Sequence, residues 1–352
     1  MKFIFILGRD IELSIAECKA YFDDFEILER FENVFLVECN LVDFSRLGGV
    51  VKVAKVLTQA IGLNELEYAL NKDVIYSGSK NKLVYSVENY KSDYGEFVKE
   101  YLKEWFKKNH FKAQYKKELS PSKGAKHFDI LVEFILFKEY LGKTIFVSDP
   151  SKLEFRDKNT IFSGEVGTSL RLARILINLS GVKKGVLFDP SCGDGSILQE
   201  GMLMGYDVIG YDKKIINAKK NIFWLKSHYN LITNCKLLYD LNLKKNSVDI
   251  IVTEPDLGPP LRKLASLEDA KKISFDLKKR YLELLDLAIH TLKPNGFMVI
   301  IVSKIRVYPN KEVGFNFEKM VENKHFKLVI PQLEYFTPRS KIRRWIYVIQ
   351  KI

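Results

Sequence analysis

The chain has 352 residues, more than one ordinary domain holds, so its length predicts two or three domains. Its 47% hydrophobic and 28% charged residues are typical of a globular protein with enough apolar material for a core. The formal net charge of +12 favours a polyanionic partner, with nucleic acid as the first expectation. A lysine-rich surface that is merely solvated would carry the same charge, so that alternative stays open.

Cysteine spacing and hydrophobic runs exclude further classes. The four cysteines are scattered, with no CxxC pair and no histidine cluster beside them, at positions 18, 39, 192 and 235. This pattern argues against a zinc or other metal site and against a disulfide framework. The apolar start is broken by Arg9 and Asp10, and no run approaches the length of a membrane span. We therefore expect a soluble, cytoplasmic protein without a membrane partner, and nothing indicates an oligomer.

The first 64 residues predict a small α+β unit of ferredoxin-like type. Its elements are a strand over 2–7, a helix over 10–22, a strand over 31–39 and a helix over 44–57. Residues 65–148 predict a second unit, with a strand over 82–89, an amphipathic helix over 94–108 and a strand pair over 128–137 and 143–147. The polar, turn-forming stretch that follows predicts a linker over 149–165.

From residue 166 to 352 the pattern becomes a regular alternation of strands and helices. Helices are expected over 169–178, 197–204, 215–227 and 281–292, and strands over 185–188, 207–211, 236–239, 248–252, 297–302 and 345–350. The strand over 248–252 is apolar except for Asp249, as in a parallel sheet buried on both faces. This part of the chain therefore predicts a doubly wound α/β domain.

A glycine turn follows the first strand of this domain, in the segment DPSCGDG that includes Asp189, Cys192, Gly193 and Gly195. Glycine lets the backbone approach a ligand closely, and the next helix offers free N–H groups. About twenty residues later the second strand ends at Asp212, where an acid hydrogen-bonds a ribose in dinucleotide-type folds. Asp240 ends the third strand and is placed to reach an adenine edge.

Two cofactors fit this pattern, NAD and S-adenosylmethionine. The proline and cysteine before the glycines, and the lack of a third glycine, favour S-adenosylmethionine. The alternative is a plain turn with solvated aspartates.

The segment TEPDLGPP, from Thr253 to Pro260, follows the fourth strand. Amino-group methyltransferases place an Asp or Asn, two prolines and an aromatic residue here, and the acid or amide orients the target NH₂ at the methyl donor. Aligned without a gap, Glu254 takes the place of the acid, Pro255 and Asp256 those of the prolines, and Leu257 that of the aromatic residue. A one-residue shift puts Asp256 on the aromatic position, so both registers lack the ring. An ordinary proline-rich turn is the alternative.

The order of these parts resembles the THUMP-containing tRNA guanosine N2-methyltransferases, the archaeal and eukaryotic group that acts at tRNA position ten. The similar segments are FILGRDIELS at 5–14, RD at 156–157, GTSL at 167–170, LARILINL at 172–179, DPSCGDG at 189–195 and GYD at 210–212. The catalytic loop departs from the family's usual Asp-Pro-Pro-Tyr.

The resemblance implies a Rossmann-like methyltransferase domain preceded by a ferredoxin-like and THUMP RNA-binding module, the THUMP part lying at 65–148. It implies a transferase of the EC 2.1.1 class that moves methyl from S-adenosylmethionine to the exocyclic N2 of a guanosine in tRNA. Glu254 and Pro255 would hold the amine, and Thr168 would border the cofactor. Whether a small activating partner protein is needed, which nucleotide is the target and whether one or two methyls are added stay open.

Lysines around residues 107–126 lie between aromatic residues and predict an RNA contact, with phosphates bound by the cations and unpaired bases stacked on the rings. The candidates are Lys112, Lys116, Lys117 and Lys123, together with Arg339 and Arg343 of a second basic stretch at 339–344. Core packing of Phe106 and Phe111 is the alternative for the first stretch, and salt bridging to nearby acids is the alternative for the second.

Two other functions remain. One is an RNA-binding protein that keeps the methyltransferase fold but has lost catalysis, and the other is an adenine N6 methyltransferase acting on DNA or RNA.

Overall fold

The computed structural model describes residues 1–40, 43–76, 82–116, 131–149, 151, 155–156, 168–308, 311–335 and 340–352. The chain forms two compact units. Unit 1 consists of Met1–Ile11, Phe22–Ser45 and Gly49–Lys152. Unit 2 consists of Glu12–Tyr21, Arg46–Gly48 and Leu153–Ile352. The chain therefore enters unit 2 twice before residue 50 and returns to it for its C-terminal half.

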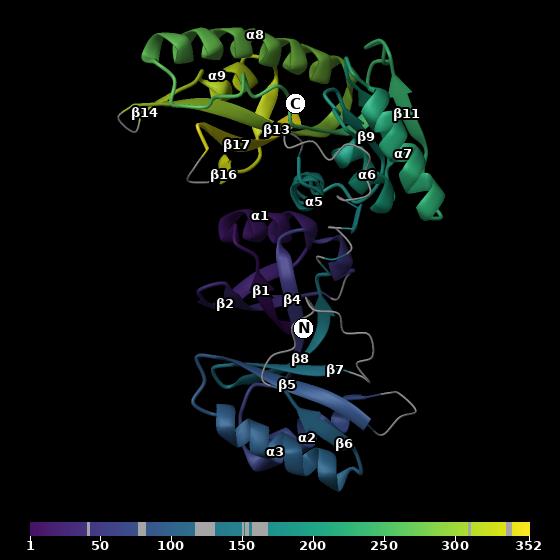
Figure 1. Cartoon of the computed structure of the whole chain (residues 1–352), viewed down its shortest axis with the longest axis vertical. Coiled ribbons are helices and arrows are strands. Elements are labelled where there is room, and N and C mark those ends of the chain that lie inside the picture. Colours follow the sequence, from purple (N-terminus) through teal and green to yellow (C-terminus); the bar gives the residue numbers. More distant parts are fainter. Residues whose placement is uncertain are drawn as a thin grey trace. The chain divides into compact units, whose positions relative to one another are not determined.

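Unit 1 is built on one sheet, in which the described residues form eight strands in the order β2-β3-β1-β4-β8-β7-β5-β6. The strands are β1 (Lys2–Leu7), β2 (Phe25–Phe31), β3 (Val34–Cys39), β4 (Val50–Thr58), β5 (Lys82–Tyr90), β6 (Lys112–Tyr115), β7 (Leu131–Phe137) and β8 (Tyr140–Val147). Helices α2 (Leu63–Lys72) and α3 (Gly95–Lys108) pack on strands β5 and β7 through Leu66, Leu102 and Phe106 (Figure 1). Strand β4 belongs to the predicted unit 1–64 and strand β8 to the predicted unit 65–148. Their antiparallel pairing therefore joins the strands of both predicted units into one sheet.

The predicted helix over residues 44–57 is wrong. Only the single turn Phe44–Arg46 is helical, and Val50–Thr58 forms strand β4 between β1 and β8. Gly48 and Gly49 disfavour a continuous helix, and the four β-branched valines that follow favour a strand. Strand β2 and helix α2 were not predicted.

Unit 2 contains a second sheet, with the described strand order β11-β10-β9-β12-β13-β17-β15. The strands are β9 (Val186–Asp189), β10 (Asp207–Tyr211), β11 (Cys235–Leu238), β12 (Val248–Thr253), β13 (Leu292–Val307), β15 (Phe326–Leu328) and β17 (Ile342–Lys351), with β14 (Lys311–Val313) paired to β13 and β16 (Leu333–Tyr335) to β17. Strands β9 to β13 run parallel, and β17 is antiparallel between β13 and β15. This is the doubly wound arrangement that the sequence predicts.

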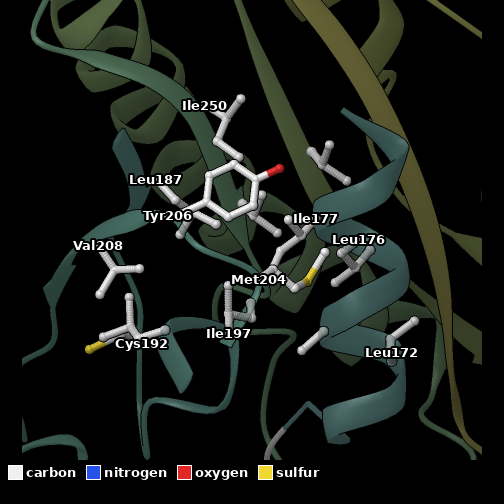
Figure 2. Close-up of a cluster of buried hydrophobic side chains, with 14 of the residues drawn as sticks. Leu172, Leu176, Ile177, Leu187, Cys192, Ile197, Met204, Tyr206, Val208 and Ile250 are labelled. Atoms are coloured by element: carbon white, nitrogen blue, oxygen red, sulfur yellow. The ribbon is translucent and has the colours of Figure 1, made fainter. Parts of the chain in front are cut away.

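Helices cover both faces of this sheet (Figure 1). They are α5 (Leu170–Leu179), α6 (Ser196–Leu203) and α7 (Ile216–His228) on one face, and α8 (Leu267–Thr291) and α9 (Phe317–Glu322) on the other, while α1 (Ile11–Tyr21) contributes Leu13 to the same core cluster as α5. Successive strand residues point to opposite faces, so Leu187 packs under the first group and Phe188 under the second. Figure 2 shows the first layer, where α5 meets Leu187 and Ile250.

Helix α1 belongs to unit 2 although strand β1 before it belongs to unit 1. Leu13 packs in the same core cluster as α5. Glu17 is fully buried, and its Oε1 accepts hydrogen bonds from the Gly48 amide at 2.8 Å and Asn178 Nδ2 at 2.7 Å. A buried carboxylate is tolerated only when its oxygens have such donors, so these bonds specify where α1 docks.

A buried ion-pair network ties the segment before α5 to the centre of unit 2. The Glu200 carboxylate on α6 is fully buried, and its Oε2 accepts from Arg174 Nε at 2.9 Å and Nη2 at 2.8 Å. Its Oε1 pairs with Arg156, which is 3% exposed. Arg156 falls near the middle of the predicted linker, so this residue is held on unit 2.

Replacing Glu200 should destabilise the protein strongly, because two guanidinium groups would lose their buried partner. We expect Glu200→Ala to lower the free energy of unfolding by about 3–5 kcal/mol in urea titrations followed by tryptophan fluorescence. Asp286→Ala, which removes an exposed pair with Lys324, is the control and should cost less than about 1 kcal/mol. Equal losses in the two variants would contradict the structural role of Glu200.

Candidate cofactor and catalytic site

The carboxyl ends of β9, β10 and β12 border one cavity of about 1340 Å³ in unit 2. Strand order reverses between β9 and β12, which is where open α/β sheets bind their ligands. The cavity brings together most of the predicted site residues, namely Thr168, Asp189, Cys192, Gly193, Asp212, Glu254, Pro255 and Asp256. Gly195 and Asp240 are not among the residues that line it.

The glycine turn connects β9 to α6 with two residues in the left-handed region. Gly193 has φ +51° and Gly195 has φ +84°, conformations that L side chains rarely adopt. A Cβ on Gly193 would meet no atom within 4 Å, so this backbone faces open space in the cavity. A Cβ on Gly195 would lie 3.3 Å from Ala218 Cβ, so Gly195 serves the packing of the turn on α7.

Asp212 links the turn to the end of β10. Its Oδ2 accepts from the Gly193 amide at 3.0 Å, and its Oδ1 accepts from the Lys214 amide at 2.8 Å. A carboxylate has about four acceptor sites, so half-buried Asp212 keeps capacity for a hydroxyl donor in the cavity. Asp240 follows β11 and is exposed.

Asp189 is buried at the end of β9. Its Oδ1 accepts from Thr253 Oγ1 at 2.8 Å and from the Ser191 amide at 3.0 Å, joining β9 to β12. Burial raises the pKa of Asp189 to about 7, although both hydrogen bonds act in the opposite direction. Burial also raises the pKa of the Cys192 thiol, so Cys192 lines the cavity as a protonated, weakly reactive group.

Glu254 follows the last residue of β12 and is held from two sides. Its Oε2 accepts from Thr168 Oγ1, and its Oε1 lies 3.3 Å from Arg344 Nε of β17. The side chain is only 8% exposed, yet Oε1 has no hydrogen bond of good geometry within the described residues. Glu254 therefore presents a desolvated carboxylate oxygen with acceptor capacity in the cavity.

The rest of the loop borders the same cavity but makes other contacts. Pro255 is buried, and Asp256 is exposed. The Asp256 carboxylate pairs with Arg280 of α8 and accepts from the Gly258 amide at 2.9 Å. Leu257 packs against the core cluster. Glu254 is thus the acid of the loop that is both buried and directed to the cavity.

The predicted RNA-binding residues take different positions. Lys112 on β6 is exposed and Lys116 is half-buried, whereas Lys117, Lys123 and Arg339 lie outside the described residues. Phe106 is buried, and Phe111 packs against its cluster, so core packing describes both rings. Arg343 Nε lies 2.6 Å from Glu312 and Nη1 3.0 Å from Glu334, so the salt-bridged alternative describes this residue.

Sequence reasoning missed the partners of the loop acids. Arg344 lies in the predicted basic stretch, but its pairing with Glu254 joins residues ninety positions apart. The pairing of Arg280 with Asp256 could not be predicted either, because a single arginine on a charged helix face is common.

Within the described ranges, no group of three or more metal-binding side chains comes together, and no helix is long and apolar enough to cross a membrane.

The sheet order, the glycine turn and the acid-proline loop at its switch point define a Rossmann-like methyltransferase domain. The model of the UPF0020 family, described as RMKL-like, methyltransferase domain, matches residues 160–310. That range contains both the turn and the loop.

The names of two curated relatives also state a substrate. The tRNA (guanine(10)-N2)-dimethyltransferase of Methanothermobacter thermautotrophicus is 37% identical over 138 residues, which is 37% of each chain. The probable tRNA (guanine(10)-N2)-dimethyltransferase of Methanothermococcus thermolithotrophicus is 34% identical over 147 residues, covering 38% of this chain and 80% of that protein. The chain therefore belongs to the tRNA (guanine(10)-N2)-dimethyltransferase family. The match spans about a third of the length of the Methanothermobacter relative.

Among solved structures, TrmN from Thermus thermophilus aligns over the whole of both chains, with a TM-score of 0.49 and 15% sequence identity.

The raised pKa of Asp189 makes stability depend on pH. The folded state binds the Asp189 proton more tightly than the unfolded state does. The resulting contribution to the free energy of unfolding is therefore fully present below about pH 4 and is lost as the pH rises to about 7. Asp189→Asn keeps an acceptor for Thr253 and Ser191 but does not titrate. We expect the free energy of unfolding of the wild type, relative to this variant, to fall by about 2–3 kcal/mol between pH 5 and pH 8 in urea titrations.

Exposed Asp286 provides the control, and Asp286→Asn should run parallel to the wild type over this pH range. If Asp189→Asn also ran parallel, the carboxyl would already be ionised at pH 5.

Proposed function

We propose that this protein is an S-adenosylmethionine-dependent tRNA methyltransferase that acts on the exocyclic N2 of a guanosine. The observation that carries the proposal is Glu254, whose desolvated carboxylate lies in the same cavity as the glycine turn. Two relatives whose names state dimethylation of guanine 10 at N2 support the substrate, and addition of two methyls is the matching expectation.

The cavity suits the proposed cofactor on three counts. The Gly193 backbone is open to a ligand, Asp212 keeps acceptor capacity for a ribose hydroxyl, and apolar Ile197 adjoins them. When bound, S-adenosylmethionine supplies an activated methyl group. Thr168 lines the cavity, and its hydroxyl donates to Glu254, so it connects the cofactor side to the acid.

Glu254 orients the amine of the target. A carboxylate that accepts from the N2 amine directs the nitrogen lone pair toward the methyl donor, and this alignment provides most of the catalysis. Arg344 and Thr168 hold Glu254 in place, and the buried setting strengthens its hydrogen bonds. The target base must leave its stack to reach the cavity.

Unit 1 would hold the tRNA in this proposal, with residues 65–148 as the THUMP-type domain. Exposed Lys112 and half-buried Lys116 support phosphate binding there. Action in the cytoplasm is the corresponding further expectation, and the need for a small activating partner protein stays open.

Cofactor binding should depend on open space above Gly193. We expect Gly193→Ala to weaken S-adenosylmethionine binding at least about tenfold in calorimetric titrations, because the new Cβ projects into the cavity. Gly205→Ala is a matched control, since Gly205 also has a left-handed φ and no atom within 4 Å of an added Cβ, but it does not line the cavity. Similar affinities for both variants would place the cofactor elsewhere.

Methyl transfer should depend on Glu254. With labelled S-adenosylmethionine and bulk unmodified tRNA, we expect Glu254→Ala to lower kcat about 100-fold while cofactor affinity changes less than about threefold. Glu334→Ala, which removes an exposed acid paired with an arginine, should keep wild-type activity.

Nucleoside analysis of the labelled RNA separates the rivals. Methylated guanosine supports the proposal, whereas N6-methyladenosine supports the adenine methyltransferase. Cofactor binding without label in any tRNA indicates the non-catalytic RNA-binding protein.

A further inference from the structure

The proposed function leaves the target base without an aromatic partner in the loop. Leu257 stands where amino-group methyltransferases carry a ring; it lines the cavity and packs against the core cluster, but its aliphatic side chain offers no ring to a base. A base that has left its stack loses stacking energy, and aromatic side chains commonly replace it. A ring from another element of the cavity would meet this need.

Helix α8 lies directly beside the loop. A Cβ on Gly258 would come within 3.1 Å of Ile273 Cγ2, and Asp256 pairs with Arg280. The stretch of α8 from residue 273 to 280 therefore adjoins both the middle and the end of the loop. Phe275 lies within this stretch and lines the cavity.

Phe275 is the aromatic side chain of the cavity that has a free face. Its side chain is 74% exposed, although phenylalanine is usually buried. Among the described residues, the other two rings that line the cavity are committed elsewhere. Tyr281 is fully buried and donates its hydroxyl to the Ile301 carbonyl at 3.0 Å, and half-buried Tyr211 packs against the core beside the cofactor turn.

A cation lies on the same stretch of helix. Lys279 is four residues beyond Phe275, so the two side chains are neighbours on the helix surface, and both line the cavity. A free aromatic face next to a lysine is the combination that binds an unpaired nucleotide, with the ring under the base and the cation near its phosphate.

We propose that Phe275 stacks on the target base once it has left its helix, and supplies from α8 the ring that the catalytic loop lacks. This inference rests on the proposed function. Stacking accepts any base, so Phe275 holds the plane of the base while Glu254 recognises the amine. Phe275 is therefore a substrate-binding residue and has no part in binding the cofactor.

Activity measurements with a matched control test this role. We expect Phe275→Ala to lower kcat/KM for tRNA roughly 5- to 150-fold, equivalent to about 1–3 kcal/mol at 1.4 kcal/mol per tenfold change. Phe275→Trp and Phe275→Tyr should keep most of the activity, and Phe275→Leu should not, because it restores apolar bulk without a ring. Phe223→Ala is the control, since Phe223 on α7 is 76% exposed and lies outside the cavity.

A fluorescence measurement keeps the test independent of turnover. A short single-stranded RNA with one 2-aminopurine, which also carries a 2-amino group, should be quenched on binding to the wild type and to Phe223→Ala. It should be quenched much less by Phe275→Ala at saturating protein.

The outcomes separate this inference from the function on which it rests. Loss of quenching and of kcat/KM in Phe275→Ala alone supports it. Equal quenching by Phe275→Ala and Phe223→Ala, or full activity in Phe275→Leu, overturns it. A wild type that methylates no tRNA but quenches through Phe275 defeats the proposed reaction and leaves base stacking by Phe275 supported.

Discussion

The site depends on one hydrogen bond between neighbouring parallel strands, from Thr253 Oγ1 to Asp189 Oδ1 at 2.8 Å. Because β9 and β12 run in the same direction at the point where strand order reverses, their carboxyl ends meet. Two segments about sixty residues apart in sequence thereby border one cavity. A shift of either strand would separate the cofactor turn from the acid of the loop, since the next residue after Thr253 is Glu254.

Glu254 is held in place by elements that lie far apart in the sequence. Three elements contribute to its position: β12 ends one residue before it, the segment before α5 supplies Thr168, and β17 supplies Arg344. Glutamate has one more rotatable bond than aspartate, so an unsupported side chain would lose more entropy on taking up one fixed geometry. The two contacts restrict that freedom before a substrate arrives.

Structural features that depend on residues close together in the sequence could be predicted, whereas features that depend on contacts between distant residues could not. Strand β10 and helices α5, α6 and α7 were predicted within about one residue, because apolar periodicity and glycine turns are local signals. The region 44–57 was mistaken for a helix because its apolar spacing suits both structures, and only pairing with β1 and β8 selects a strand. The glycine turn between β9 and α6 was likewise readable from sequence. The Glu254–Arg344 pair was not, because no local pattern connects a loop residue with one ninety positions later.

The placement of α1 in unit 2 has a consequence for synthesis of the chain. During translation, Leu13 and Glu17 emerge roughly 160 residues before Asn178 and the other partners on α5. Helix α1 must stay unpacked, or be shielded, until the C-terminal half has been made, so completion of unit 2 is a late and long-range event. For the same reason, no single cut in the chain separates the two units: a fragment that starts after residue 150 would expose the surface of α5 that α1 covers and leave Asn178 without its buried acceptor on Glu17.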